Sequence, residues 1–366
     1  MDSIPQELID AIIDNVPLSS LPSCSLVAKR WQRKSQQRVL ATISFLSERK
    51  VERWCTDIPQ DSDRISSYVR HVKIEIYFWI VPALLSHLLG SLSSLTALSM
   101  YETQIPDELS GHISWGELGK GITTLDLRFS RCTFATLTSM IPSLPDLKQL
   151  YIEECDGVAE GSLPTHPVTH QRGPLGSLEL IGYVGGIGEA LAKSRFTSRR
   201  LTLGVAITGI EQLLLLSSEM VVELTLNGVW FFSDRAETIV TDLPDVSVAK
   251  APPPIHLPSL PALTTLVVHI HMDRPSPHLT NILCSIGSAP ALTSIIIKYD
   301  DWMVLDHLPL ADSWVDVDRW LSGIAKHAKV EGGLPLTLMR WAFWEGFLPE
   351  FRESGGRVEV DNRGWY

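Results

Sequence analysis

A glycine-rich stretch, GYVGGIGEALA at residues 182–192, has a spacing that suits the binding of a phosphate-bearing cofactor. It follows the apolar run LGSLELI, so a strand, a turn and a helix are expected in that order. Glycines in such a turn let the backbone approach a pyrophosphate at the N-terminus of the helix. The chemistry that this stretch suggests is therefore the binding of a dinucleotide.

The surroundings of the glycine-rich stretch argue against that chemistry. Its spacing resembles the cofactor loop of short-chain dehydrogenases, which follows the first strand of a domain and works with a Tyr-x-x-x-Lys pair. None of the seven tyrosines has a lysine four residues later. The next apolar run, SRRLTLGVAI, ends without the acidic residue that a ribose contact requires. We interpret the stretch as a turn between repeats, and we expect no cofactor.

Two other stretches carry residues of metal sites or of acid/base catalysis. In HIHMDRPSPH, the side chains of His269 and His271 share one face of a strand, as metal ligands do, and Asp273 and His278 follow. The sequence offers no further ligands at later strand ends. We therefore interpret the histidines of this stretch as surface residues. The segment 299–318 holds six aspartates and no lysine or arginine, which favours an exposed acidic loop over a catalytic pair. We expect no metal, no catalytic residue and no enzyme activity.

The composition narrows the partners. The chain has 366 residues, 45% of them hydrophobic and 20% charged, which is typical of a folded protein. Its formal net charge of −11 argues against nucleic acid and anionic membranes as partners. No apolar run is long enough to cross a membrane. The five cysteines are scattered, and the first residues, MDSIPQELID, are unlike a signal peptide. We therefore expect an intracellular protein, in the cytoplasm or the nucleus.

The first 45 residues differ from the rest of the chain. Apolar residues recur at helical spacing in IPQELIDAIIDNV and again in LPSCSLVAKRW, with prolines between them. The basic run KRWQRKSQQR that begins at Lys29 is interpreted as the solvated face of a helix. Three short helices bury little surface by themselves, so such a unit usually needs a partner.

These two stretches resemble the F-box family, whose pattern is Leu-Pro-x-Glu-Leu, then Ile, then Leu, and finally Val-x-x-x-Trp. Ile4 stands where leucine is usual, a conservative difference in volume. The resemblance covers about 45 residues and implies docking to the Skp-type adaptor of a cullin-based ubiquitin ligase. The contact residues that it implies are Ile4, Pro5, Leu8, Ile12, Leu21, Leu26, Val27 and Trp31. The alternative is a helical cap that packs only on its own chain.

Beyond residue 60 a pattern of Leu-x-Leu recurs. The first apolar positions of the successive pairs are separated by 23–29 residues, apart from one interval of 42 that contains APPPIHLPSL. This is the period of leucine-rich repeats, in which strands stack to share one core. These positions are Val72, Leu98, Leu125, Leu150, Leu178, Leu201, Leu224, Leu266 and Ile295. Cys155 stands where such repeats often carry Asn or Cys.

The residues between the paired leucines are expected to point away from the core, on a concave strand face. Parallel strands lie about 4.8 Å apart, so equivalent positions form columns across the sheet. The central column and its neighbours then bring together four carboxylates and one aromatic ring, which suits a basic peptide. The alternative is that these are ordinary solvated strand residues. The predicted target-binding residues are Asp126, Tyr151, Glu153, Glu179 and Glu223.

The sequence therefore predicts an α/β protein with an N-terminal three-helix F-box at 1–50 and a leucine-rich-repeat-like solenoid at 51–366. Its parallel sheet would line the concave face, and an irregular cap would begin at about 296. This arrangement resembles a large, divergent F-box group of fungi. The function that follows is target recognition for a Skp–cullin–F-box ubiquitin ligase. The alternative is a leucine-rich-repeat interaction scaffold without a link to ubiquitin.

Overall fold

The computed structural model describes residues 4–57, 63–77, 80–105, 119–132, 134–155, 173–182, 187–204, 210–227, 259–270, 283, 286, 289–299, 315–327, 335–339 and 349–361. The chain forms two compact units, residues 1–151 with 155–165, and residues 152–154 with 166–366. Strand β7 (Gln149–Glu153) is divided between them after Tyr151.

The first unit begins with short helices, α1 (Gln6–Asp14), η1 (Leu18–Ser20), α2 (Leu21–Val27) and α3 (Lys29–Leu40). Pro5 precedes α1 and Pro17 precedes η1, each with a φ near −55°. A proline at such a position has no N–H to leave unpaired, so it starts a helix without loss. The extended Ala28 (φ −160°) separates α2 from α3.

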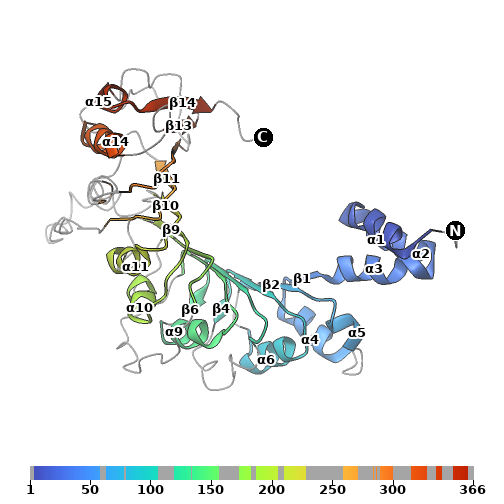
Figure 1. The fold of residues 1–366 in the computed structure, drawn as a ribbon. Coiled ribbons are helices and arrows are strands. Elements are labelled where there is room, and N and C mark those ends of the chain that lie inside the picture. Colours follow the sequence, from blue (N-terminus) through green and yellow to red (C-terminus); the bar gives the residue numbers. More distant parts are fainter. Residues whose placement is uncertain are drawn as a thin grey trace, which may run out of the picture. The chain divides into compact units, whose positions relative to one another are not determined.

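The rest of the first unit alternates strands and helices. The main strands are parallel and lie side by side in the order β1, β2, β3, β5 and the start of β7, and Figure 1 shows α6 and α9 on the same side of them. The elements are β1 (Thr42–Phe45), α4 (Glu48–Asp57), α5 (Asp63–Ser66), β2 (His71–Glu75), α6 (Pro82–Gly90), β3 (Ala97–Tyr101), β5 (Thr124–Arg128) and α9 (Phe134–Ser143). Strands β4 (Gln104–Ile105) and β6 (Arg131–Cys132) form a separate parallel pair.

The register of these strands follows the Leu-x-Leu pattern. Val72 pairs with Leu98, and Leu98 pairs with Leu125, so that the apolar positions stand in one row. These side chains are fully buried, as are Leu85 and Leu88 of α6. Full burial of a leucine stabilises a fold by about 1.5–3 kcal/mol. The shared apolar row is therefore the core of this sheet.

Four of the strands end in the same local structure. Two residues after the second apolar position the backbone is left-handed, with φ 50° at Glu102, 50° at Phe129, 43° at Glu154 and 69° at Gly182. Only glycine adopts this conformation freely, and for other residues it costs roughly 1–2 kcal/mol. The recurrence of the conformation shows that the turns at these four positions share one backbone feature.

A small polar side chain follows the left-handed residues Glu102, Phe129 and Glu154 and bonds to the preceding strand. Thr103 Oγ1 lies 3.3 Å from the carbonyl oxygen of Ile74, and Ser130 Oγ lies 3.1 Å from that of Met100. Cys155 Sγ donates to the carbonyl of Leu127 at 3.9 Å. All three donors are buried, so these bonds satisfy carbonyls that water does not reach. Cys155 occupies the position that the repeat pattern predicts.

The second unit continues the strand pattern after β7. Seven parallel strands lie in the order β8 to β14. In register, the row of first apolar positions runs Leu178, Leu201, Leu224, Leu266, Ile295, Leu336 and Val358. The strands are β8 (Ser177–Ile181), β9 (Arg200–Gly204), β10 (Glu223–Asn227), β11 (Thr265–Ile270), β12 (Ser294–Tyr299), β13 (Pro335–Met339) and β14 (Arg357–Asp361). The helices are α10 (Ile187–Lys193), α11 (Ile210–Ser217), α14 (Val315–His327) and α15 (Pro349–Glu353).

The α/β class is confirmed, but three expectations about the strands differ from the structure. Strand β1 starts at Thr42 and pairs with β2, so the sheet begins inside the region assigned to the F-box. The region after 296 is more regular than expected, because β13 and β14 extend the sheet in register. The column between the leucines is not uniformly exposed, since Ser99 and Val267 are buried at 3% and 6% exposure.

Candidate functional site

The three N-terminal helices share a very small core. Ile9 and Ile13 of α1 and Leu21 of α2 are buried against one another. Ile4, Val16 and Trp31 pack around them and are partly buried. Three buried side chains supply little of the apolar burial on which folding depends, so other interactions must hold these helices together.

Basic residues of α3 supply part of that stabilisation. Their side chains bond to α1 or to the residues that flank it. The pairs are Arg30 with the Ile4 carbonyl (2.8 Å), Arg38 with the carbonyls of Ile13 and Val16, and Lys34 with the Asp14 carboxylate (3.0 Å). The basic run is therefore not simply a solvated face, because three of its cations tie α3 to α1.

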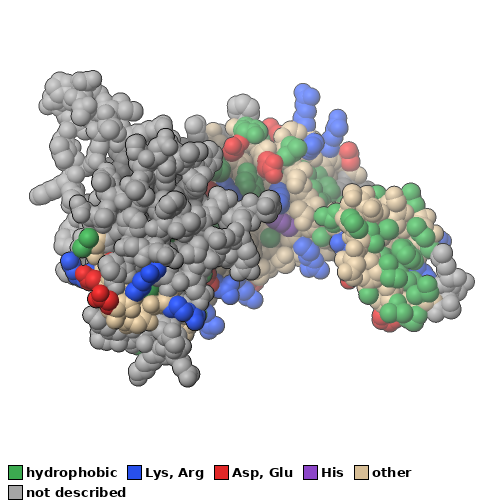
Figure 2. Space-filling model, turned by 90° about the horizontal axis from the view of Figure 1, so that it is seen from above, with side chains coloured by type: hydrophobic (Ala, Val, Ile, Leu, Met, Phe, Trp, Pro, Cys, Tyr) green, Lys and Arg blue, Asp and Glu red, His purple; other side chains and the backbone are tan. Residues whose placement is uncertain are grey.

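The same helices expose an apolar surface. Leu8 and Ile12 lie one turn apart on α1 and are 56% and 46% exposed. Leu26 and Val27, at the end of α2, are 86% and 54% exposed. Figure 2 shows hydrophobic side chains gathered over this part of the molecule. We call Leu8, Ile12, Leu26 and Val27 the helical apolar surface. Contiguous exposed apolar side chains of this kind mark protein-binding sites.

The other residues predicted to bind the adaptor lie at different depths. Pro5 is exposed beside the helical apolar surface, while Ile4 and Trp31 are partly buried against the core. Leu21 is fully buried. Its side chain stabilises the helical unit from inside and is not available to a partner in this structure, so direct contact by Leu21 is not supported.

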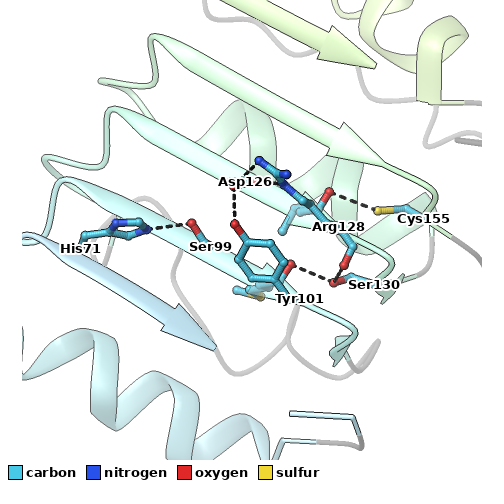
Figure 3. Close-up of polar contacts among 9 residues, drawn as sticks. His71, Ser99, Tyr101, Asp126, Arg128, Ser130 and Cys155 are labelled. Carbon is cyan, nitrogen blue, oxygen red and sulfur yellow. Dashed lines mark hydrogen bonds and ion pairs between the residues drawn. The ribbon is translucent and has the colours of Figure 1, made fainter. Parts of the chain in front are cut away.

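A second constellation lies on the strand face of the first unit (Figure 3). Asp126 of β5 accepts a hydrogen bond from the Tyr101 hydroxyl of β3 at 3.0 Å. Its carboxylate also accepts two bonds from Arg128, at 2.9 Å and 3.3 Å. The guanidinium of Arg128 lies 4.1 Å from the ring centre of Tyr151 and 5.5 Å from that of Tyr101. We call Tyr101, Asp126, Arg128 and Tyr151 the tyrosine–arginine cluster.

The electrostatics of this cluster favour its ion pair. Burial lowers the pKa of Arg128, but the hydrogen bond and charge of Asp126 outweigh burial and raise the pKa above its ordinary value. Burial also raises the pKa of Tyr101, and its bond to Asp126 raises it further. The cluster is thus a charged pair held between two neutral phenols. Tyrosine and arginine are the residues that most often dominate the binding energy of protein interfaces.

His71 extends the polar contacts across the strands of the first unit. Its Nε2 lies 2.8 Å from the Ser99 hydroxyl, on the neighbouring strand (Figure 3). Burial lowers the pKa of His71, the charge of Lys73 lowers it further, and the charge of Asp126 opposes both. The imidazole is therefore biased toward its neutral form, which can either donate to or accept from the serine.

The predicted acidic surface is distributed over both units. Asp126 and Tyr151 belong to the first unit, where Arg128 neutralises the carboxylate. Glu153, Glu179 and Glu223 belong to the second unit and are half-buried. The sequence pattern did not predict Tyr101 as a site residue, although it lies two residues after Ser99 on the same strand face.

The carboxylates of the second unit have local partners. Glu223 lies 3.7 Å from Arg200 of the neighbouring strand β9. The Ser177 hydroxyl donates to Glu179 at 3.4 Å. Both contacts are partly exposed and weak, so they reduce the negative charge of this face only modestly.

The glycine-rich stretch runs from the end of β8 into α10. Gly182 takes the left-handed position that ends the strands on the first unit as well, and Gly188 lies inside α10. Residues 183–186 lie outside the described part of the chain. The conformation of Gly182 is therefore explained by the repeated turn.

The two remaining stretches are described only in part. His269 lies on β11, whereas His271, Asp273 and His278 lie outside the described residues. In the described part of the chain, no three His, Cys, Asp or Glu side chains are grouped as metal ligands. Of the acidic segment 299–318 only its ends are described, and Asp318 is buried rather than exposed. Its carboxylate accepts the backbone N–H groups of Glu350 and Phe351, at 3.0 Å and 2.9 Å, and so caps α15.

Comparison with known proteins gives one match. Residues 1–40 match the F-box domain, so the N-terminal helices α1 to α3 are an F-box. F-box domains bind Skp-type adaptors of ubiquitin ligases. No curated protein matches the chain. Among the described residues no helix is both long enough and apolar enough to span a membrane.

Proposed function

We propose that this F-box protein is a target-recognition subunit of a Skp–cullin–F-box ubiquitin ligase. The observation that carries the proposal is the helical apolar surface on the F-box, because four exposed apolar side chains need a hydrophobic partner. The Skp-type adaptor is the partner that F-box domains bind, and the cullin would be recruited through it. The chain would perform no chemistry itself and would need no cofactor.

The remainder of the chain would act as a leucine-rich-repeat-like solenoid that holds the target. Three observations support this assignment. The apolar pairs recur with a period of 23–29 residues, the strands pair in register within each unit, and the turns of the first unit repeat one bonded conformation. In repeat proteins of this class the strand face is extended and accessible, and it serves to bind other proteins.

The target would bind the strand face, at the tyrosine–arginine cluster. Two tyrosines and an arginine already lie in fixed positions there, so binding would cost little side-chain entropy. A bound target would then stay close to the ligase. The mechanism is a raised effective concentration of the target at the site of ubiquitin transfer.

The proposal is tested by co-purification of the full chain with the Skp-type adaptor. The variant Leu8→Asp places a carboxylate in the helical apolar surface and should abolish capture of the adaptor. A matched control is Leu215→Asp, because Leu215 of α11 is also exposed, at 47%, but lies in the second unit. Capture of the adaptor should be unchanged in the control. If the wild-type chain fails to capture the adaptor, it is a repeat scaffold without a link to ubiquitin.

A further inference from the structure

Three neighbouring strand ends of the first unit carry exposed side chains that the tyrosine–arginine cluster does not use. Tyr77 follows β2 and is 72% exposed, and Phe129 follows β5 and is 47% exposed. Between them Glu102 follows β3 and is also exposed. We call Tyr77, Glu102 and Phe129 the strand-end row.

Phe129 is the least expected residue of this row. Its φ of 50° is a conformation that bulky side chains rarely adopt. At the equivalent position after β8 the chain has Gly182, which adopts the conformation without strain. Half of the phenylalanine side chain remains in water, so burial offsets little of the strain. Stability therefore does not explain why a phenylalanine stands here.

The contacts of the row show that its members are neighbours. The backbone N–H of Glu102 donates to the carbonyl of Arg128 at 2.9 Å, which places the ends of β3 and β5 side by side. The charge of Glu102 raises the pKa of the Tyr77 hydroxyl, and the charge of Glu75 raises it further. The row thus combines two aromatic rings with nearby negative charge.

The cation closest in sequence to the row is committed elsewhere. The guanidinium of Arg128 bonds to Asp126 and lies over the rings of Tyr101 and Tyr151. The negative charge of Glu102 and Glu75 is therefore presented beside exposed aromatic faces. Carboxylates and aromatic faces together attract lysine and arginine side chains. The net charge of −11 favours the approach of a basic partner over long range.

We propose that the strand-end row binds a basic segment of the target protein, with a lysine or arginine side chain against Phe129 or Tyr77 and paired with Glu102. This inference rests on the proposed function and assigns the chemistry of the target. It moves the basic-partner prediction from the middle of the strand face, where Arg128 neutralises Asp126, to the strand ends.

The experiment measures peptide binding by the purified full chain in low salt. The probe is a fluorescein-labelled nonapeptide of alternating lysine and glycine, and the counterpart has glutamate in place of lysine. We expect saturable binding of the lysine peptide, weakened by added salt, and no binding of the glutamate peptide. Phe129→Ala, Phe129→Gly and Glu102→Gln should each weaken binding of the lysine peptide about tenfold, which corresponds to about 1.4 kcal/mol.

The two substitutions of Phe129 separate recognition from stability. Phe129→Gly removes the ring and relieves the backbone, so its thermal midpoint should rise, whereas Phe129→Ala removes the ring and retains the strain. Loss of binding in both variants shows that the ring itself binds. Unchanged binding in Phe129→Gly overturns the proposal, and so does a lysine peptide that never saturates.

A charge control tests whether the location matters. Glu52 of α4 is exposed in the same unit, and Glu52→Gln removes one negative charge there. Its binding of the lysine peptide should equal that of the wild type. Equal weakening by Glu52→Gln and Glu102→Gln would mean general attraction and would overturn the proposal. Capture of the adaptor is measured on the same preparations and does not depend on the strand-end row. A failure of the proposed function would therefore appear as lost adaptor capture, whatever the peptide result.

Discussion

At the residue scale, single contacts change what a surface can bind. Asp126 lies between the paired leucines of β5, and in isolation its carboxylate would favour a basic partner. The guanidinium of Arg128 lies two residues away on the same face and takes both carboxylate oxygens. The result is a pre-ordered pair between tyrosine rings, whose charge is balanced. The side-chain exposure of Asp126 is 14%, so the pair is only partly screened by water.

The ion pair of the cluster should be measurable by a double-mutant cycle. We expect Asp126→Ala and Arg128→Ala to be coupled by about 1 kcal/mol in the free energy of unfolding, because each removes the partner of the other. The measurement is urea denaturation of the four proteins, repeated in 1 M NaCl, where the coupling should shrink. A coupling that is zero at low salt would show that the pair adds nothing to stability.

In the F-box, burial separates residues that bind from residues that support. Leu21→Ala should destabilise the helices by about 3 kcal/mol, because it leaves a cavity in a core of three side chains. Leu26→Ala should change stability by less than about 0.5 kcal/mol, since Leu26 is 86% exposed, but it should weaken adaptor capture. Hydrogen exchange of α1 to α3 measures the first effect. Equal stability of both variants would contradict this division.

At the scale of elements, the strand ends are defined by conformation as much as by side chains. The left-handed residue turns the chain out of the strand, and the next side chain bonds back to the previous strand. Glu102 with Thr103 and Phe129 with Ser130 repeat this arrangement in the first unit. Because the turn conformation is retained with glutamate and with phenylalanine at the left-handed position, different side chains can occupy it in the first unit, and function can select among them.

The glycine at the same position in the second unit should tolerate no side chain. Gly182→Ala should destabilise by about 1–2 kcal/mol, because φ is 69° and an added Cβ would lie 2.5 Å from the Glu154 side chain. The control is Gly323→Ala, within α14, where nothing lies within 4 Å of an added Cβ. The control should stabilise by up to about 1 kcal/mol. Thermal unfolding of both variants checks the opposite signs.

The short helix α15 depends on a cap supplied by α14. Asp318→Ala should destabilise by about 1–2 kcal/mol, because two backbone N–H groups at the start of α15 lose their acceptor. Asp318→Asn retains a carbonyl oxygen and should retain part of that stability. The rate of proteolysis near Phe351, which is fully buried, measures the stability of this region. An exposed acidic loop would predict no difference between the three proteins.

At the scale of the whole molecule, one chain carries two surfaces with different chemistry. The helical apolar surface lies on the F-box, and the tyrosine–arginine cluster and the strand-end row lie on strands. Neither surface includes residues of the other, so each can be removed separately. The proposed function requires only that both surfaces belong to one polypeptide.

This requirement predicts a failure of complementation. Leu8→Asp should lose the adaptor and retain the target, whereas Tyr151→Ala should retain the adaptor and lose the target. Either variant alone should not support ubiquitin transfer to the target, and an equimolar mixture should not restore it, because proximity needs both sites on one chain. A reconstituted ubiquitylation assay measures this. Restored transfer by the mixture would show that the chain does not act by bridging.

The sequence by itself determined the features that depend on local periodicity. Apolar spacing defined the helices of the F-box, and the Leu-x-Leu period defined the strand positions and their register, because alternate side chains of a strand share one face. The C-terminal strands β13 and β14 lie in LPLTLMRW and GRVEVDNR, which the sequence indicated only as fragments that close the repeat, since their spacing is irregular. The fold class and the adaptor-binding element therefore followed from residues that are close in sequence.

Only the tertiary structure decided which side chains meet and which stay exposed. The turns bring Tyr77, Glu102 and Phe129 to neighbouring strand ends, although more than 20 residues separate each from the next. The capping role of Asp318 and the burial of Leu21 likewise depend on neighbours that are distant or in another helix. The physical reason is that periodicity assigns a residue to a face, whereas exposure and charge pairing depend on the elements packed against that face.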